Sequence, residues 1–251
     1  MKRVSKSLEE PPALTDYKRD NAHIPSNLVW TRFKKRPDRR EPLRSQLRAD
    51  QRGLCAYCEN ALIPQDESVE HFIARDADHS RELDWNNLLL CCAGGERPLP
   101  EDIEDADVCY DPQDLRTCGH AKLGSRESIL NPLHIPHTPR LFRFKSETGE
   151  ILPDEAEYQP ARIDTALARQ TIGVLGLHAG RLNRARLRLL NDLLVELGNN
   201  GQTEPFSVDR ERELAEVYLP ATGPLPGFFT TLRFSLGEGA EAHLASINFQ
   251  G

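Results

Sequence analysis

Long hydrophobic runs are absent from this chain of 251 residues: no segment approaches the roughly 18 to 20 apolar residues that a membrane-spanning helix needs. The N-terminal sequence MKRVSKSLEEPPAL also lacks the apolar core of a secretory signal. We therefore expect a cytoplasmic protein with no membrane partner. Internal repeats and low-complexity segments are missing too, and 38% hydrophobic and 28% charged residues are ordinary for a globular protein.

An excess of positive charge is also lacking, since the net charge is −7. This argues against a protein that coats nucleic acid by bulk electrostatics. The charge is uneven, however: residues 32–52 hold nine Lys or Arg against three acids, and residues 96–114 hold eight acids against one Arg. A local basic strip can neutralise phosphates, or it can be the solvated face of a helix, and the charge pattern leaves both readings open.

Six cysteines are present, and Cys55 and Cys58 form a C-x-x-C pair. In a reducing compartment this spacing indicates a metal site more than disulfides, because two thiolates from one turn reach the same ion. A structural zinc takes four ligands, and the predicted partners are Cys92 and Cys118.

Two further cysteines compete for these positions. Cys91 is the rival of Cys92 for the third ligand, and Cys109, within the acidic segment, is a less favoured substitute. Buried thiols without a metal are the alternative for the whole set, although a second group of cysteines behind the C-x-x-C pair favours zinc.

A second cluster of reactive side chains lies between the cysteines. Glu70 and His71 fall on a strand predicted over residues 68–74, and Asn86-Asn87 follows at a distance that a hairpin could close. A neutral imidazole is suited to taking a proton from water near pH 7. A divalent ion held by Glu70 and a second group could neutralise charge on a phosphorane-like transition state and the leaving oxygen, and an Asn side chain could orient the imidazole. This set is consistent with phosphodiester hydrolysis. The alternative is that His71 has only a structural role.

The rest of the chain is predicted from its apolar spacing and its turn residues. In the first half we expect an extended arm over residues 1–40 with a short helix at 27–35, then a helix at 41–53, a loop and second element at 83–91, and an inserted loop at 93–117. In the second half we expect a hairpin that turns at Thr148-Gly149, followed by helices at 160–177, 179–197 and 207–218. The apolar stretch at 226–237 is ambiguous.

The segments VEHFIAR, DWNNLLLCC and CGHAK, preceded by the C-x-x-C pair, resemble the HNH nuclease motif in its zinc-stapled ββα-metal form. In this resemblance His71 matches the general-base histidine, Asn87 the asparagine that orients it, and Glu70 the neighbouring ligand of the catalytic metal. Lys122 matches the lysine four residues past the last cysteine. Lys122 and Arg75 are the candidates for contact with nucleic acid.

The chain departs from that motif in two ways. The second zinc pair, matched by Cys92 and Cys118, is split by about 25 residues instead of forming a C-x-x-C. Gly119 stands where the pattern has Asn or His. His120 follows one place later, so it is assigned the remaining role of catalytic-metal ligand, with a structural histidine near the zinc as the alternative.

The order of these segments along most of the chain is similar to the HNH subunit of Septu-type and retron-associated antiphage defence systems. This resemblance implies an α+β fold with a small ββα-metal core, an N-terminal arm and a mostly helical C-terminal region. The corresponding ranges are 1–44 for the arm, 45–125 for the core with its acidic insertion at 93–117, and 126–251 for the C-terminal region.

The resemblance implies a metal-dependent endonuclease that hydrolyses phosphodiester bonds, with DNA favoured over tRNA or other RNA. Its cofactors would be a catalytic Mg²⁺ or Mn²⁺ and a structural Zn²⁺. Its partners would be an ABC-type ATPase and, in a retron, a reverse transcriptase with its RNA–DNA product. The alternative is a zinc-stapled adaptor without catalysis, which only Gly119 favours. A zinc hydrolase of small molecules ranks below both, because the chain supplies thiolates where such a site needs other ligands.

Overall fold

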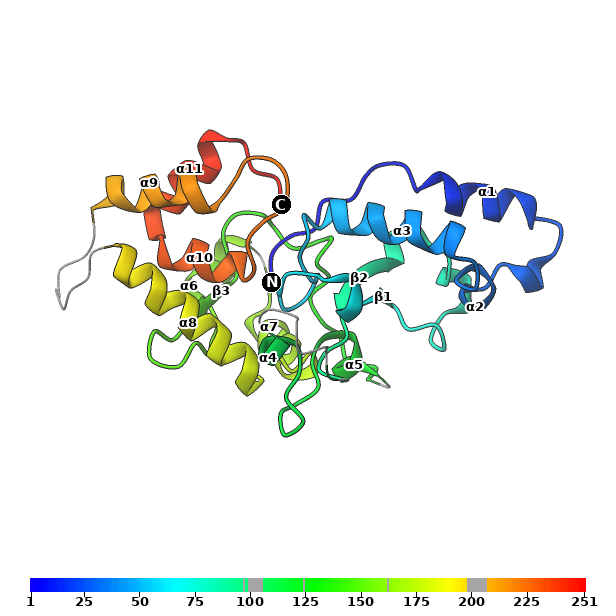
Figure 1. Cartoon of the computed structure of the whole chain (residues 1–251), viewed down its shortest axis with the longest axis horizontal. Helices are drawn as coiled ribbons and strands as arrows, with labels where there is room; N and C mark the ends of the chain where they lie inside the picture. The colour runs from blue at the N-terminus through cyan, green and yellow to red at the C-terminus, as the bar shows by residue number, and fades with distance from the viewer. Residues whose placement is uncertain (97, 99–105, 124, 162, 198–206) are drawn as a thin grey trace.

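The computed structural model describes residues 1–251 except positions 97, 99–105, 124, 162 and 198–206. Figure 1 shows an elongated molecule: the first helices lie at one end and the last helices at the other, with a two-stranded sheet beside the first group. Helices are combined with two small antiparallel sheets, so the fold is α+β, as predicted.

The N-terminal segment is more helical than predicted. It forms, in order, α1 (Pro12–Asp20), a 3-10 turn (Pro25–Asn27), α2 (Trp30–Phe33) and α3 (Pro37–Asp50). The expectation of an extended arm is wrong for α1, whose Leu14 and Tyr17 are buried in a cluster with residues of α3. Two apolar residues in a polar stretch give a weak sequence signal, and packing against α3 stabilises the helix.

Helix α3 begins earlier than expected. It begins at Pro37 instead of Glu41, and Pro42 lies inside it. Pro37 takes the first-turn position, where the missing N–H leaves no helical hydrogen bond unmade. Leu43 and Leu47, four residues apart, are both buried, as their spacing predicts.

The first sheet carries the candidate catalytic residues. Strand β1 (Glu67–His71) pairs antiparallel with β2 (Leu88–Cys92), and the register places His71 opposite Leu88. The short helix α5 (Cys118–Lys122) contacts β2. His71 therefore stands at the last position of the paired strand, where the chain leaves the sheet.

Strand β2 is buried along its whole length, which explains its unbroken apolar run. Leu88 and Leu90 belong to the cluster formed with the N-terminal helices, whereas Leu89 and Cys91 belong to the cluster around the cysteines. Successive side chains point to opposite faces of a strand. One five-residue strand thus joins the core of the N-terminal helices to the core around the cysteines.

The C-terminal half is mostly helical, as predicted. Its elements, with the short helix that precedes them, are α4 (Ala106–Cys109), β3 (Phe142–Phe144), β4 (Ile151–Pro153), α6 (Glu155–Ala161), α7 (Thr165–Val174), α8 (Gly180–Glu196), α9 (Val208–Tyr218), α10 (Phe229–Ser235) and α11 (Gly237–Ser246). The hairpin, with Gly149 in its turn, and the helices α8 and α9 are confirmed, and Ser207 caps α9. The helix predicted at 160–177 is divided between α6 and α7, and α7 begins after its cap Asp164.

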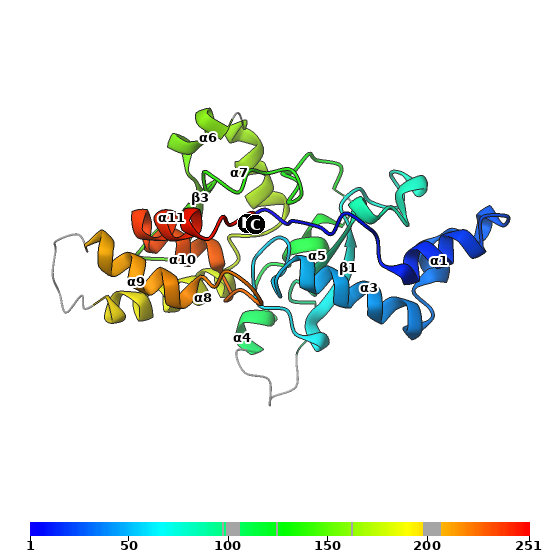
Figure 2. The same cartoon turned by 90° about the horizontal axis from the view of Figure 1, so that it is seen from above.

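The ambiguous stretch at 226–237 contains α10. Figure 2 shows α6 and α7 on one side of the molecule and α4 on the other.

Part of the predicted insertion at 93–117 lies outside the described residues; the described part includes α4. The division of the chain at residues 44 and 125 stays a prediction. Among the helices of the described ranges, none is long and apolar enough to cross a membrane.

Candidate active site and metal centre

Four cysteines from distant parts of the sequence come together next to β2. The Sγ atoms of Cys55, Cys58, Cys92 and Cys118 all lie within 4.8 Å of one another, and all four residues are buried. Neighbouring sulfurs are 3.6 to 3.7 Å apart. A regular tetrahedron with Zn–S bonds of about 2.3 Å has edges of about 3.8 Å, so the spacing fits a structural zinc. The predicted ligand set is thus brought together.

The two competing cysteines are outside this set. Cys91 is buried beside the cluster, but its sulfur is not among the four that lie within mutual reach. Cys109 is buried at the end of α4, where its sulfur accepts a hydrogen bond from Nδ2 of Asn60 at 3.4 Å. Of the two candidates for the third position, the structure therefore favours Cys92.

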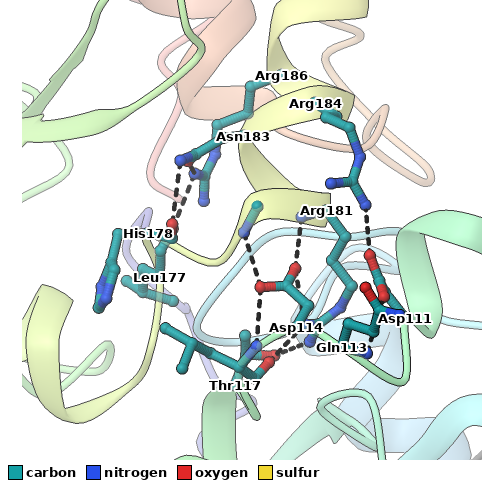
Figure 3. Close-up of polar contacts among 12 residues, drawn as sticks. Asp111, Gln113, Asp114, Thr117, Leu177, His178, Arg181, Asn183, Arg184 and Arg186 are labelled. Atoms are coloured by element: carbon teal, nitrogen blue, oxygen red, sulfur yellow. Dashed lines mark hydrogen bonds and ion pairs between the residues drawn. The ribbon is translucent and has the colours of Figure 1, made fainter.

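The residues just before Cys118 are fixed by the start of α8 (Figure 3). Asp114 accepts the backbone N–H of Arg181 at 2.6 Å. The buried guanidinium of Arg181 donates to Oγ1 of Thr117 at 2.8 Å and to the carbonyl oxygen of Leu115 at 2.6 Å. The insertion separates Cys118 from Cys92, and the start of α8 holds the residues before Cys118 in place.

His71 is buried at the end of β1, with its Nε2 atom 2.9 Å from the carbonyl oxygen of Glu82. A carbonyl oxygen can only accept, so Nε2 carries the proton in the neutral ring and Nδ1 keeps its lone pair. Burial lowers the pKa of His71 to about 4, which keeps the ring neutral at pH 7. The Trp30 ring packs edge-on at 5.2 Å between centroids. The ring is therefore fixed with one basic nitrogen available.

Glu82, which the sequence did not single out, supports His71 in a second way. Its carboxylate accepts the backbone N–H of Trp30 at 2.9 Å and lies 3.0 Å from Nδ1 of His79. The residue that fixes the His71 ring is thus itself fixed by α2. No local pattern signals this contact, because Trp30 and Glu82 are more than 50 residues apart in the sequence.

Asn87 is placed differently from its predicted role. Its side chain accepts the N–H of Ile73 at 2.7 Å and donates to the carbonyl oxygens of Ile73 and Arg81, both at 3.0 Å. Among the residues that the structure describes, no hydrogen bond joins the Asn87 side chain to the imidazole ring of His71. The contacts of Asn87 instead tie together the segment that leads to Glu82, so its influence on His71 is indirect.

Glu70 and Lys122 form an ion pair beside His71. Nζ of Lys122 lies 2.7 Å from Oε1 of Glu70 and donates to the carbonyl oxygen of His71 at 2.9 Å. Lys122 is buried, so it is held within the site and is not presented freely to solvent. A Cβ atom at Gly119 would lie 2.6 Å from Oε2 of Glu70, so the carboxylate occupies the space that an Asn or His would need at that position.

His120 is directed toward Glu96. Its Nε2 atom lies 3.4 Å from Oε2 of Glu96. Among the described residues, the cysteine cluster is the only set of three or more His, Cys, Asp or Glu whose ligand atoms lie together, so Glu70, His71 and His120 do not form such a set. The reason is geometric: one residue step turns a helix by about 100°, and α5 directs Gly119, not His120, toward Glu70.

A cleft of about 750 Å³ opens beside these residues. Its lining includes Glu70 and His71 together with three cations, Lys34, Arg75 and Lys122. Arg75 is exposed, which agrees with its predicted availability for nucleic acid. Lys34 follows α2 directly, and the fold of the N-terminal segment is what brings it to the cleft.

Four arginines of the predicted basic strip are paired with nearby carboxylates. Ion pairs join Arg36 to Asp38, Arg40 to Glu41, Arg44 to Glu41 and Glu67, and Arg48 to Glu67. For α3 the structure therefore favours the reading as a solvated helix face. Lys34 differs from these arginines because it lines the cleft.

His71 thus has a fixed tautomer at one end of the first sheet, next to the Glu70 carboxylate, and Cys92 of the four-cysteine cluster lies at the other end. The chain is 30% identical over 209 residues to the retron Ec83 putative HNH endonuclease of Escherichia coli, an alignment that covers 76% of this chain and 79% of that relative. The chain belongs to the HNH endonuclease family. No protein-family model matches it.

Proposed function

We propose that the chain is a metal-dependent endonuclease that hydrolyses phosphodiester bonds of nucleic acid, with DNA as the favoured substrate. The observation that carries this proposal is the state of His71: a buried, neutral imidazole whose Nε2 is engaged by Glu82 and which lines an open cleft. The packing of β1, β2 and α5 around it supports a ββα-metal core.

In this mechanism Nδ1 of His71 takes a proton from the attacking water. The hydrogen bond from Nε2 to the Glu82 carbonyl oxygen fixes the tautomer of the neutral ring. Nδ1 therefore carries no proton and can act as the base. Asn87 acts as a positioning residue, because it holds the segment that presents the Glu82 carbonyl. Lys122 holds Glu70 and the His71 carbonyl and so keeps the end of the strand in place.

A divalent cation fits the site through Glu70. Magnesium is commonly held by one or two carboxylates together with water and phosphate oxygens, so one protein carboxylate in an open cleft is a sufficient donor set. When bound, Mg²⁺ or Mn²⁺ would neutralise charge that develops on the phosphate oxygens. His120 is not proposed as a second ligand, since it pairs with Glu96.

The four-cysteine cluster is proposed to hold a structural Zn²⁺. It would fix the turn after α3, the end of β2 and the start of α5 to one another. A zinc ion held there would have no chemical role in the cleft, because the four thiolates would take all of its positions.

We also propose that the protein acts in antiphage defence under the control of an ABC-type ATPase. The support is the resemblance of segment order, together with a relative whose name places that relative with a retron. A reverse transcriptase with its RNA–DNA product would be a further partner in that setting. A cytoplasmic location is part of the same proposal.

One observation favours a second candidate, an adaptor that binds without cutting. Glu70 is paired with an ammonium, and the neighbouring position that usually supplies a second ligand is Gly119. The two candidates differ in one measurable property. A nuclease degrades plasmid, single-stranded DNA or tRNA in the presence of Mg²⁺ or Mn²⁺, whereas an adaptor retains binding and leaves all three intact.

A further inference from the structure

We infer that nucleic acid crosses the active cleft along three free cations: Arg75, within the segment that follows His71, and Lys34 and Arg126, which line the two hollows beside that segment. This inference rests on the proposed nuclease function and names the phosphate-binding residues of that same site. All three cations are exposed. Within the described part of the chain, none of them makes an ion pair or a side-chain hydrogen bond.

Two hollows adjoin at this segment. The cleft of about 750 Å³ beside His71 shares Ala74, Asp76 and Lys122 with a second hollow of about 540 Å³. Lys34 lines the first hollow and Arg126 lines the second. Each hollow alone has the volume of a small-molecule site, so the pair suits a chain that passes through both.

The cations of this groove differ from three arginines of α3. Arg40, Arg44 and Arg48 are paired with nearby carboxylates, so they have little attraction left for a polyanion. Lys34, Arg75 and Arg126 differ from these arginines because they line the hollows beside His71, which is where a scissile phosphate has to lie if Nδ1 is to act on its water. Of the other charged groups that line the two hollows, Lys122 pairs with Glu70, and the Glu82 carboxylate contacts Trp30 and His79. The three cations then face the carboxylates of Asp76 and Glu127, a local excess of positive charge that can attract a polyanion in spite of the net charge of −7.

Leu123 supports a nucleic acid over an acidic peptide as the occupant. It is a large apolar side chain, 75% exposed, that lines the cleft directly after Lys122. Apolar side chains next to phosphate-binding cations contact the sugars and bases of nucleic acids. Asp76 also lines both hollows, and its carboxylate opposes any phosphate close to it.

The test measures binding separately from cutting. In the full chain with His71→Ala, a fluorescein-labelled DNA duplex is titrated by anisotropy at several salt concentrations. Lys34→Gln and Arg126→Gln should each weaken binding about fivefold and each reduce the salt slope by about one, because each removes one phosphate contact. Asp76→Asn should tighten binding. The control is Arg210→Gln, on α9 at the far end of the molecule, whose guanidinium pairs with Glu213; it should change nothing.

The outcomes separate this inference from the proposed function. If Lys34→Gln and Arg126→Gln bind like their parent, the path is wrong even when the wild type cuts DNA. If the wild type cuts nothing with Mg²⁺ or Mn²⁺ while both variants still weaken binding, the nuclease proposal fails and the path stands. If polyglutamate displaces the DNA as well as unlabelled DNA of equal charge does, the groove binds acidic polymers in general and its assignment to nucleic acid is overturned.

Discussion

Asn87 and Ile73 exchange two hydrogen bonds: the N–H of Ile73 donates to Oδ1 at 2.7 Å, and Nδ2 donates back to the Ile73 carbonyl oxygen at 3.0 Å. The same Nδ2 also donates to the carbonyl oxygen of Arg81. The amide therefore ties together both ends of the segment between β1 and Glu82. A side chain expected to orient the His71 ring instead builds the loop that holds it.

Replacing Asn87 should accordingly damage stability as well as activity. Asn87→Ala removes the partner of three backbone groups, and each buried group left unsatisfied costs about 1 to 3 kcal/mol. We expect a clearly lowered Tm together with slower cutting. Asn86→Ala is the matched control, because Asn86 is exposed. Equal Tm values for the two variants would contradict the positioning role.

His120 and His71 should differ in their importance for cutting. His71 lines the cleft, whereas His120 faces Glu96, so His120→Ala should keep most of the cleavage rate and His71→Ala should lose it. Initial rates of plasmid nicking at saturating Mg²⁺ compare the two variants. If His120→Ala also abolishes cutting at every Mg²⁺ concentration, His120 belongs to the reacting centre.

The two adjacent cysteines of β2 provide a matched pair for the zinc site. Cys92 belongs to the tetrahedral set and Cys91 does not. Purified wild-type protein and Cys91→Ser should each contain about one zinc per chain, and Cys92→Ser should contain much less. Elemental analysis of the purified proteins makes the comparison. Zinc loss in Cys91→Ser with normal zinc in Cys92→Ser would reverse the assignment.

Arg181 should control how firmly the fourth zinc ligand is held. It is buried and donates to both Leu115 and Thr117, whereas Arg184, one turn later, is exposed and pairs with Asp111 (Figure 3). Arg181→Ala should release zinc to a colorimetric chelator faster and at a lower temperature. Arg184→Ala should behave nearly like the wild type, since exposed ion pairs contribute little. Identical release rates for the two variants would show that the α8 contact is not needed.

Features carried by local spacing could be predicted from the sequence, and features created by distant contacts could not. The C-x-x-C pair and the strand that carries Glu70 and His71 are local, so their pattern indicated them. Helix α1 was not predicted, because two apolar residues, Leu14 and Tyr17, identify its buried face only when their packing against α3 is known.

Distance along the chain also explains where the arrangement of the site differs from the one expected. The contact of Glu82 with Trp30 joins two segments that no local pattern relates. The role given to His120 depended on counting positions past Cys118, and one helical step turns that side chain away from the cleft. Lys34 could be counted within a basic strip, but only the fold distinguishes it from the paired arginines of α3.

The most direct measurement is metal-dependent cleavage of plasmid, single-stranded DNA and tRNA by wild type, His71→Ala and the control His178→Ala, whose exposed side chain is remote in sequence from the motif. Each protein is assayed with and without the proposed ATPase. The account predicts cutting that requires Mg²⁺ or Mn²⁺, is lost in His71→Ala and persists in His178→Ala. Cutting by His71→Ala at the wild-type rate, or intact substrates in every wild-type reaction, would contradict it.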